Sequence, residues 1–127
     1  MILPDTSIWI DFFRGREPYF TQLAERMENG EVIAVEWVFG EILQGTRNAK
    51  ERRVVLSYWS HLPRPGLERG EVWIRAGIRS AEEKFPSRGV GLIDAAILVA
   101  AEETGARVWT LDKKLARALP QALQFRG

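Results

Sequence analysis

One segment of the 127-residue sequence restricts the fold more than any other, the run from Leu92 to Thr104. Residues 95–101 are apolar at every position, and Gly105 follows where a helix of this length would end. A helix that is apolar on all sides must be surrounded by protein, so the segment predicts a buried central helix. The apolar stretch is interrupted by Asp94 and is too short to cross a bilayer. We therefore expect no contact with a membrane.

Short apolar segments alternate with helical patterns along the rest of the chain. Strands are expected at residues 1–4, 31–36, 107–111 and 123–125. Helices are expected at residues 7–14, 20–27, 37–44, 49–60, 68–84 and 113–119, with a proline-containing connector at 61–66. Strands separated by helices predict an α/β fold with a mostly parallel central sheet. No linker or repeat divides the chain, so we expect a single domain over residues 1–127.

Composition excludes several kinds of site. The chain has no cysteine, which rules out disulfides, thiolate zinc sites and cysteine nucleophiles and fits a cytoplasmic protein. A single histidine, His61, argues against a serine–histidine triad and a histidine-rich metal site. The net charge of +1 predicts no strongly basic nucleic-acid-binding face.

Four acidic residues occupy positions at which a carboxylate needs an explanation. Asp5 and Asp112 each follow an expected strand, Asp94 lies in the first turn of the apolar helix, and Glu41 interrupts the apolar run 37–43. In a parallel sheet the carboxyl ends of the strands share one edge, where ligands bind. Burying such carboxylates is costly unless something compensates their charge, and a divalent cation would compensate all four. Oxygen ligands suit Mg²⁺ or Mn²⁺.

Each of these acids also has a structural interpretation. Asp5 and Asp112 can be helix N-caps, and a capping carboxylate can still bind a metal through its second oxygen. The helix dipole favours a negative charge such as that of Asp94 in a first turn. Glu41 can face solvent, and Glu36 is an alternative candidate for any role at this edge of the sheet. Hydroxyls that could stand near the same site belong to Thr6, Ser7 and Thr110, and candidate phosphate contacts are Arg47, Lys113 and Lys114.

Segments around these acids resemble the motifs of a known family. They are Asp5–Gly15 (DTSIWIDFFRG), Glu41–Arg47 (EILQGTR), Gly91–Ile97 (GLIDAAI) and Thr110–Asp112 (TLD). In order and spacing they are similar to the four motifs of PIN-domain ribonucleases, specifically the VapC-like toxins of type II toxin–antitoxin systems. Members often carry another acid or polar residue and then Phe after the fourth motif. Here Lys114 and Leu115 stand in those places, which indicates a site of four acids.

The resemblance implies a three-layer PIN-like fold and a Mg²⁺- or Mn²⁺-dependent endoribonuclease with Asp5, Glu41, Asp94 and Asp112 as catalytic and metal-binding residues. It also implies RNA as the substrate, inhibition by a cognate antitoxin protein, and assembly as a homodimer. Five tryptophans in a chain of this size favour a dimer independently.

Four alternative functions are compatible with part of this pattern or are excluded by it. A housekeeping RNA-processing nuclease would use the same site, and a catalytically silent RNA- or protein-binding module would keep the fold alone. A receiver-type signalling domain needs an Asp at the end of a middle strand, and none lies between Asp11 and Asp94. A haloacid-dehalogenase-type phosphatase would need a second Asp two residues after Asp5, where Ser7 stands.

Overall fold

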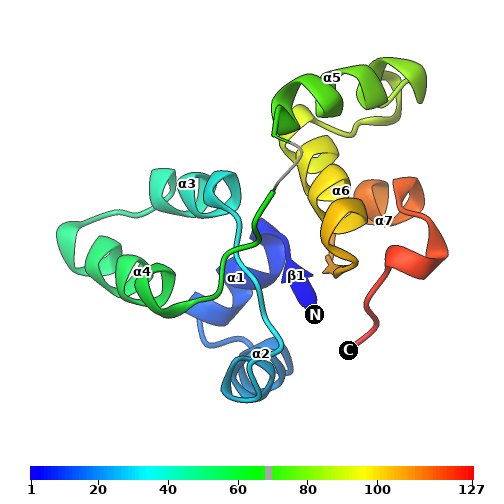
Figure 1. Cartoon of the computed structure of the whole chain (residues 1–127). Helices are drawn as coiled ribbons and strands as arrows, with labels where there is room; N and C mark the ends of the chain where they lie inside the picture. The colour runs from blue at the N-terminus through cyan, green and yellow to red at the C-terminus, as the bar shows by residue number, and fades with distance from the viewer. Residues whose placement is uncertain (68–69) are drawn as a thin grey trace.

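The computed structural model describes residues 1–67 and 70–127. Its elements follow the order β1 (Ile2–Pro4), α1 (Thr6–Phe13), α2 (Tyr19–Glu28), α3 (Glu36–Gln44), α4 (Ala49–His61), α5 (Val72–Glu82), η1 (Pro86–Arg88), α6 (Leu92–Thr104), β2 (Arg107–Trp109), α7 (Lys113–Ala118) and η2 (Gln121–Leu123). In Figure 1, α3 and α4 lie on one side of β1, and α5, α6 and α7 lie on the other.

The sheet joins the two ends of the chain. β1 and β2 pair in parallel, with Leu3 opposite Val108, and single parallel bridges add Val32 beside Ile2 and Gln124 beside Val108. The expected α/β fold with a parallel sheet is confirmed. The expected strands 31–36 and 123–125 shrink to one bridge each, because Ala34 turns to bond the Pro63 carbonyl and Leu123 closes the η2 turn.

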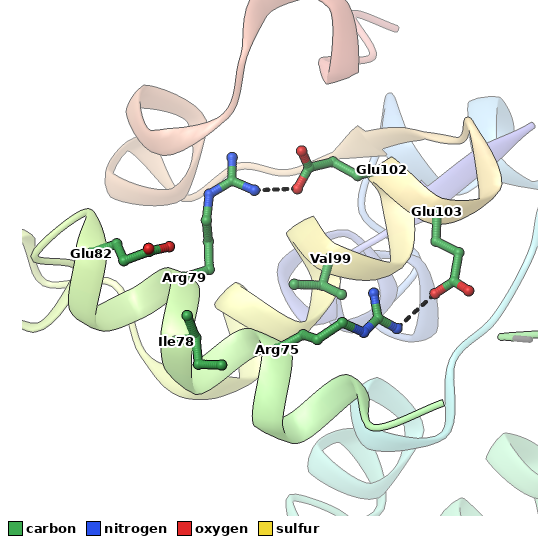
Figure 2. A pocket seen from close by; sticks show the side chains of 7 residues that line it. All are labelled: Arg75, Ile78, Arg79, Glu82, Val99, Glu102 and Glu103. Atoms are coloured by element: carbon green, nitrogen blue, oxygen red, sulfur yellow. Dashed lines mark hydrogen bonds and ion pairs between the residues drawn. The ribbon is translucent and has the colours of Figure 1, made fainter. Parts of the chain in front are cut away.

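The central helix is confirmed with its expected bounds. Every residue of α6 from Ala95 to Ala101 is buried, and Gly105 ends the helix with a φ of 74°, a left-handed conformation that glycine adopts easily. α5 packs along α6, and two arginines of α5 cross to acids of α6, Arg75 to Glu103 and Arg79 to Glu102 (Figure 2). A shallow cavity of about 300 Å³ lies between these side chains.

The start of α5 differs from the expected helix 68–84. The helix begins at Val72, since Gly70 and Glu71 have φ values of 62° and 52°, in the left-handed region. The guanidinium of Arg75 donates to the Gly70 carbonyl at 2.9 and 3.1 Å and stabilises this turn. The first two positions of the expected helix, 68 and 69, lie outside the described residues.

The amino-terminal half is held together by aromatic side chains. α1 buries Ile8, Trp9 and Phe12 rather than the expected set of Trp9, Ile10 and Phe13, of which the last two are half-buried. The Trp9 ring packs edge-on against Phe39 of α3, which joins α1 to α3. Within residues 1–67 and 70–127, no helix combines the length and hydropathy needed to cross a membrane.

Candidate active site

Asp5 stands at the carboxyl end of β1 and caps α1. Its backbone N–H donates to the Trp109 carbonyl of β2 at 2.9 Å, which holds the residue at the edge of the sheet. Its Oδ1 accepts from the Ile8 N–H at 3.3 Å and from the Ser7 hydroxyl at 2.5 Å. The residue is only 4% exposed. The expected cap is therefore present.

The second carboxylate oxygen of Asp5 faces the other end of the chain. Thr110, just after β2, donates its hydroxyl to Asp5 Oδ2, and the same hydroxyl accepts from the Asp112 N–H at 2.9 Å. A second hydrogen bond links the same two segments, because the Oγ of Ser7 in α1 accepts from the Leu111 N–H at 3.0 Å. Burial raises the pKa of Asp5, although the hydrogen bonds from Ser7 and Thr110 favour its charged form.

Asp112 caps the next helix at the same edge of the sheet. Its Oδ1 accepts from the N–H groups of Lys114 and Leu115 at 2.8 and 3.3 Å, so it is the N-cap of α7. The residue is exposed. Because both cap bonds use Oδ1, the second oxygen remains available to a ligand.

Asp94 lies in the first turn of α6, and the charges of the other three acids affect its pKa. Burial raises its pKa from 3.8 to about 6, and the negative charges of Asp5, Asp112 and Glu41 contribute in that order. A hydrogen bond from the Gly91 backbone opposes the shift. Asp94 is thus close enough to three acids from distant parts of the sequence for their charges to act on it.

Glu41 lies in α3, and its negative charge acts on Asp94. It is exposed, as is its rival Glu36 in the first turn of the same helix. Only Glu41 of these two acts on the pKa of Asp94. This electrostatic coupling favours Glu41 over Glu36 for any role beside Asp94.

The donor chemistry of this group suits a hard divalent cation. It consists of carboxylate oxygens, and a cation would relieve the repulsion that Asp94 experiences from the other three acids. The hydroxyls of Ser7 and Thr110 hold the Asp5 carboxylate from both sides. In the described part of the chain, no three such side chains stand in a ready-made ligand cluster. The fit therefore rests on the chemistry of the donors and on their electrostatic coupling.

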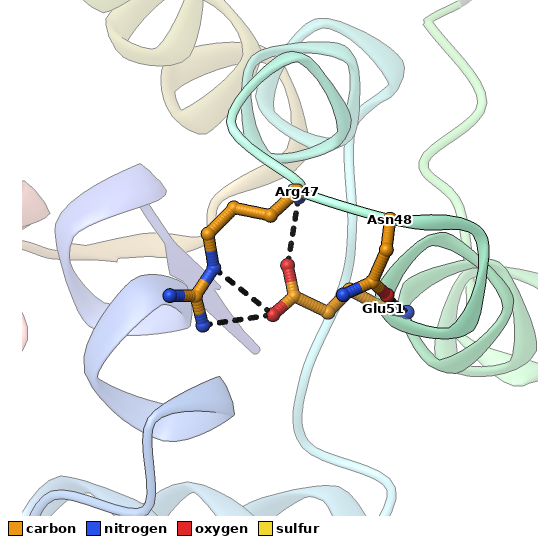
Figure 3. Close-up of polar contacts among 3 residues, drawn as sticks. All are labelled: Arg47, Asn48 and Glu51. Atoms are coloured by element: carbon orange, nitrogen blue, oxygen red, sulfur yellow. Dashed lines mark hydrogen bonds and ion pairs between the residues drawn. The ribbon is translucent and has the colours of Figure 1, made fainter.

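The remaining predicted residues divide into those near the acids and those engaged elsewhere. Thr6 follows Asp5, and among the described residues its buried Oγ1 has no hydrogen-bond partner. Arg47, in the turn between α3 and α4, is held by Glu51, which accepts from its backbone at 2.8 Å and from its guanidinium at 3.0 and 3.3 Å (Figure 3). Lys113 and Lys114 are exposed on the first turn of α7.

One residue beside the site could not be expected from the sequence. Gly89 lies under the side chain of Lys114, 25 positions away in the chain. Its position in a glycine-containing loop before α6 was the only sequence signal, and such loops usually mark a turn. The contact itself depends on how α7 packs against that loop.

Comparison with known proteins agrees with the resemblance of the motifs. The family model of the PIN domain matches residues 2–118. Ribonuclease VapC32 of Mycobacterium tuberculosis is 34% identical over 124 residues, which cover 96% of this chain and 93% of the relative.

Two solved structures share the fold. VapBC2 from Rickettsia felis, solved bound to a DNA fragment from its promoter, superimposes with a TM-score of 0.69 at 18% identity, covering 98% of this chain and 96% of that one. PAE2754 from Pyrobaculum aerophilum gives 0.58 at 20% identity, covering 93% and 78%. The chain belongs to the PIN domain family and is a VapC-like member of it.

Proposed function

We propose that this protein is a Mg²⁺- or Mn²⁺-dependent endoribonuclease of the cytoplasm and the toxin of a type II toxin–antitoxin pair. The observation that carries the proposal is the electrostatic coupling of Asp94 to Asp5, Asp112 and Glu41 at the edge of the sheet. The name of the relative, Ribonuclease VapC32, supports RNA as the substrate.

The four acids would hold the metal, and hydrogen bonds orient two of them. Asp5 is oriented by Ser7 and Thr110, and Asp112 keeps one oxygen outside its cap. When bound, Mg²⁺ or Mn²⁺ supplies a water of lowered pKa and neutralises charge developing on a phosphate. A water activated in this way needs no histidine as a base. The only histidine of the sequence, His61, bonds the Ser57 carbonyl within α4.

Substitution of the acids tests this proposal. Asp5→Asn and Asp94→Asn each remove one charge and keep the size of the side chain. We expect either change to lower Mn²⁺-dependent cleavage of single-stranded RNA by about 100-fold or more. Cleavage is followed on a labelled RNA, with EDTA as the metal-free reference and circular dichroism as the check of folding.

Glu36 and Glu41 provide a matched pair within α3. Glu41→Gln should lower cleavage, whereas Glu36→Gln should leave it within about twofold, since only Glu41 is coupled to Asp94. Full activity of Asp94→Asn would refute the site. Equal losses from the two glutamates would refute the choice of Glu41.

We also propose an antitoxin protein as a partner. The VapBC2 structure superimposes over nearly the whole of this chain, which supports a partner of the kind found in such pairs. A cationic side chain of the antitoxin, paired with the four acids, would occupy the place of the metal and block the path of a phosphate.

A homodimer completes the proposal. Trp9 and Trp109 are buried, but Trp73 of α5 is 46% exposed, beside Ile74 and Ile78 at 62% and 54%. An apolar helix face of this kind commonly marks a protein interface. We therefore place the dimer contact on α5.

A further inference from the structure

The side chain of Lys114 lies against the loop before α6. A Cβ atom built on Gly89 would lie 2.8 Å from Lys114 Cδ and 3.1 Å from its Nζ. The aliphatic stem of the lysine therefore lies across the bare backbone of Gly89. This contact exists because Gly89 has no side chain, and its φ of 72° also favours glycine.

The loop connects this lysine to the acids. Gly89 follows η1, and two residues later Gly91 caps α6 and bonds the Asp94 carboxylate through its backbone. The lysine itself follows Asp112, whose Oδ1 accepts from its backbone N–H at 2.8 Å. Lys114 thus spans from the cap at Asp112 to the loop that leads to Asp94.

The charge of Lys114 is available to an external anion. Across residues 1–67 and 70–127, no acid lies within ion-pair distance of its ammonium. The neighbouring Arg88 is engaged, because its guanidinium carbon lies over the Phe85 ring, 5.4 Å from the ring centre.

We propose that Lys114 binds a backbone phosphate of the RNA next to the one that is cleaved. The inference rests on the proposed function and adds a substrate-binding residue to it. Four clustered carboxylates repel a polyanion, and the chain as a whole carries a charge of only +1. A lysine acts on phosphate as a point charge, so this contact would position RNA without reading its bases.

The test measures RNA binding rather than cleavage. The probe is a fluorescein-labelled single-stranded RNA of 12 nucleotides, in EDTA, titrated by fluorescence anisotropy between about 25 and 200 mM KCl. Lys114→Met should weaken binding about fivefold at the lowest salt and reduce the slope of log K against log salt by about 0.7, the value for one phosphate contact on a single strand. Lys114→Arg should restore both.

Lys50→Met is the matched control, because it removes the same charge from the exposed first turn of α4. It should leave the slope unchanged. Equal effects of the two methionine variants would show a general effect of charge and overturn the proposal. So would an unchanged slope in Lys114→Met.

Gly89 offers a second, independent arm. In Gly89→Ala the new Cβ would displace the Lys114 stem, so RNA binding should weaken in the natural chain but not in a Lys114→Met background. An equal loss in both backgrounds would assign the effect to the loop and overturn the proposal.

The outcomes for Lys114 and for the nuclease are separable. RNA cleavage by the natural chain with no effect of Lys114→Met on the salt slope would refute the role of Lys114 alone. RNA binding that depends on Lys114, in a chain that cleaves no RNA with Mn²⁺, would refute the nuclease alone.

Discussion

At the scale of single residues, Asp94 is costly to keep charged. Its pKa is raised from 3.8 to about 6 by burial and by the other three acids. A group whose pKa is higher in the folded state contributes stability below its unfolded pKa and loses that contribution as the pH rises through the folded value. The metal-free protein should therefore lose stability from this group between about pH 4 and pH 6.

Asp94→Asn should stabilise the metal-free protein at pH 7.5. Each pKa unit corresponds to about 1.4 kcal/mol, and solvent screening of this half-buried group reduces the total, so we expect a gain of about 1 kcal/mol. The gain should vanish toward pH 4, where Asp94 of the natural chain is neutral. Urea unfolding in EDTA at several pH values measures the difference, with Glu36→Gln as the control. A gain that is independent of pH would contradict the expectation.

The acidic residues of the candidate site could be predicted from the sequence, but the hydrogen bonds that orient them could not. Asp5 and Asp112 were expected either as caps or as ligands, and both do cap their helices. The hydroxyl bond from Thr110 to Asp5 joins positions 105 residues apart. Such a contact has no local pattern, since it depends on the register of β1 against β2.

At the scale of elements, ion pairs differ in how much they stabilise the fold, because they differ in burial. The side chains of Arg75 and Glu103, which join α5 to α6, are 21% and 10% exposed, whereas those of Arg47 and Glu51, at the start of α4, are 86% and 34% exposed. A partly buried pair is costly to break, because the remaining charge keeps little water. An exposed pair contributes little.

Arg75→Met should therefore lower the free energy of unfolding by about 2 kcal/mol, since it also removes the bonds to the Gly70 carbonyl. Arg47→Met should cost less than about 0.5 kcal/mol. Urea unfolding of the two variants gives the comparison. Equal costs would show that burial does not decide the strength of these pairs.

Elements with strong periodicity were predictable, and those set by backbone turns were not. The helix at 92–104 has its expected bounds because its composition and Gly105 agree. The helix expected from residue 68 starts at Val72, since the left-handed conformations of Gly70 and Glu71 precede it. The expected strand 107–111 ends at Trp109, where Thr110 leaves the sheet to bond Asp5.

At the scale of the whole molecule, the exposed face of α5 predicts the oligomeric state. Ile78→Glu should convert the proposed dimer to a monomer without unfolding it, because Ile78 is already 54% exposed in one chain. Light scattering at tens of micromolar, without antitoxin, measures the mass. Val54→Glu on α4, also exposed, is the control and should stay dimeric. A monomeric natural chain would refute the interface.

The pairing of β1 with β2 also has a consequence for synthesis of the protein. Asp5 leaves the ribosome early, but its partners Trp109 and Thr110 follow more than 100 residues later. A nascent chain therefore has no organised carboxylate site until almost all of this domain has been translated. Under the proposed function, fragments that stop before β2 should therefore lack nuclease activity.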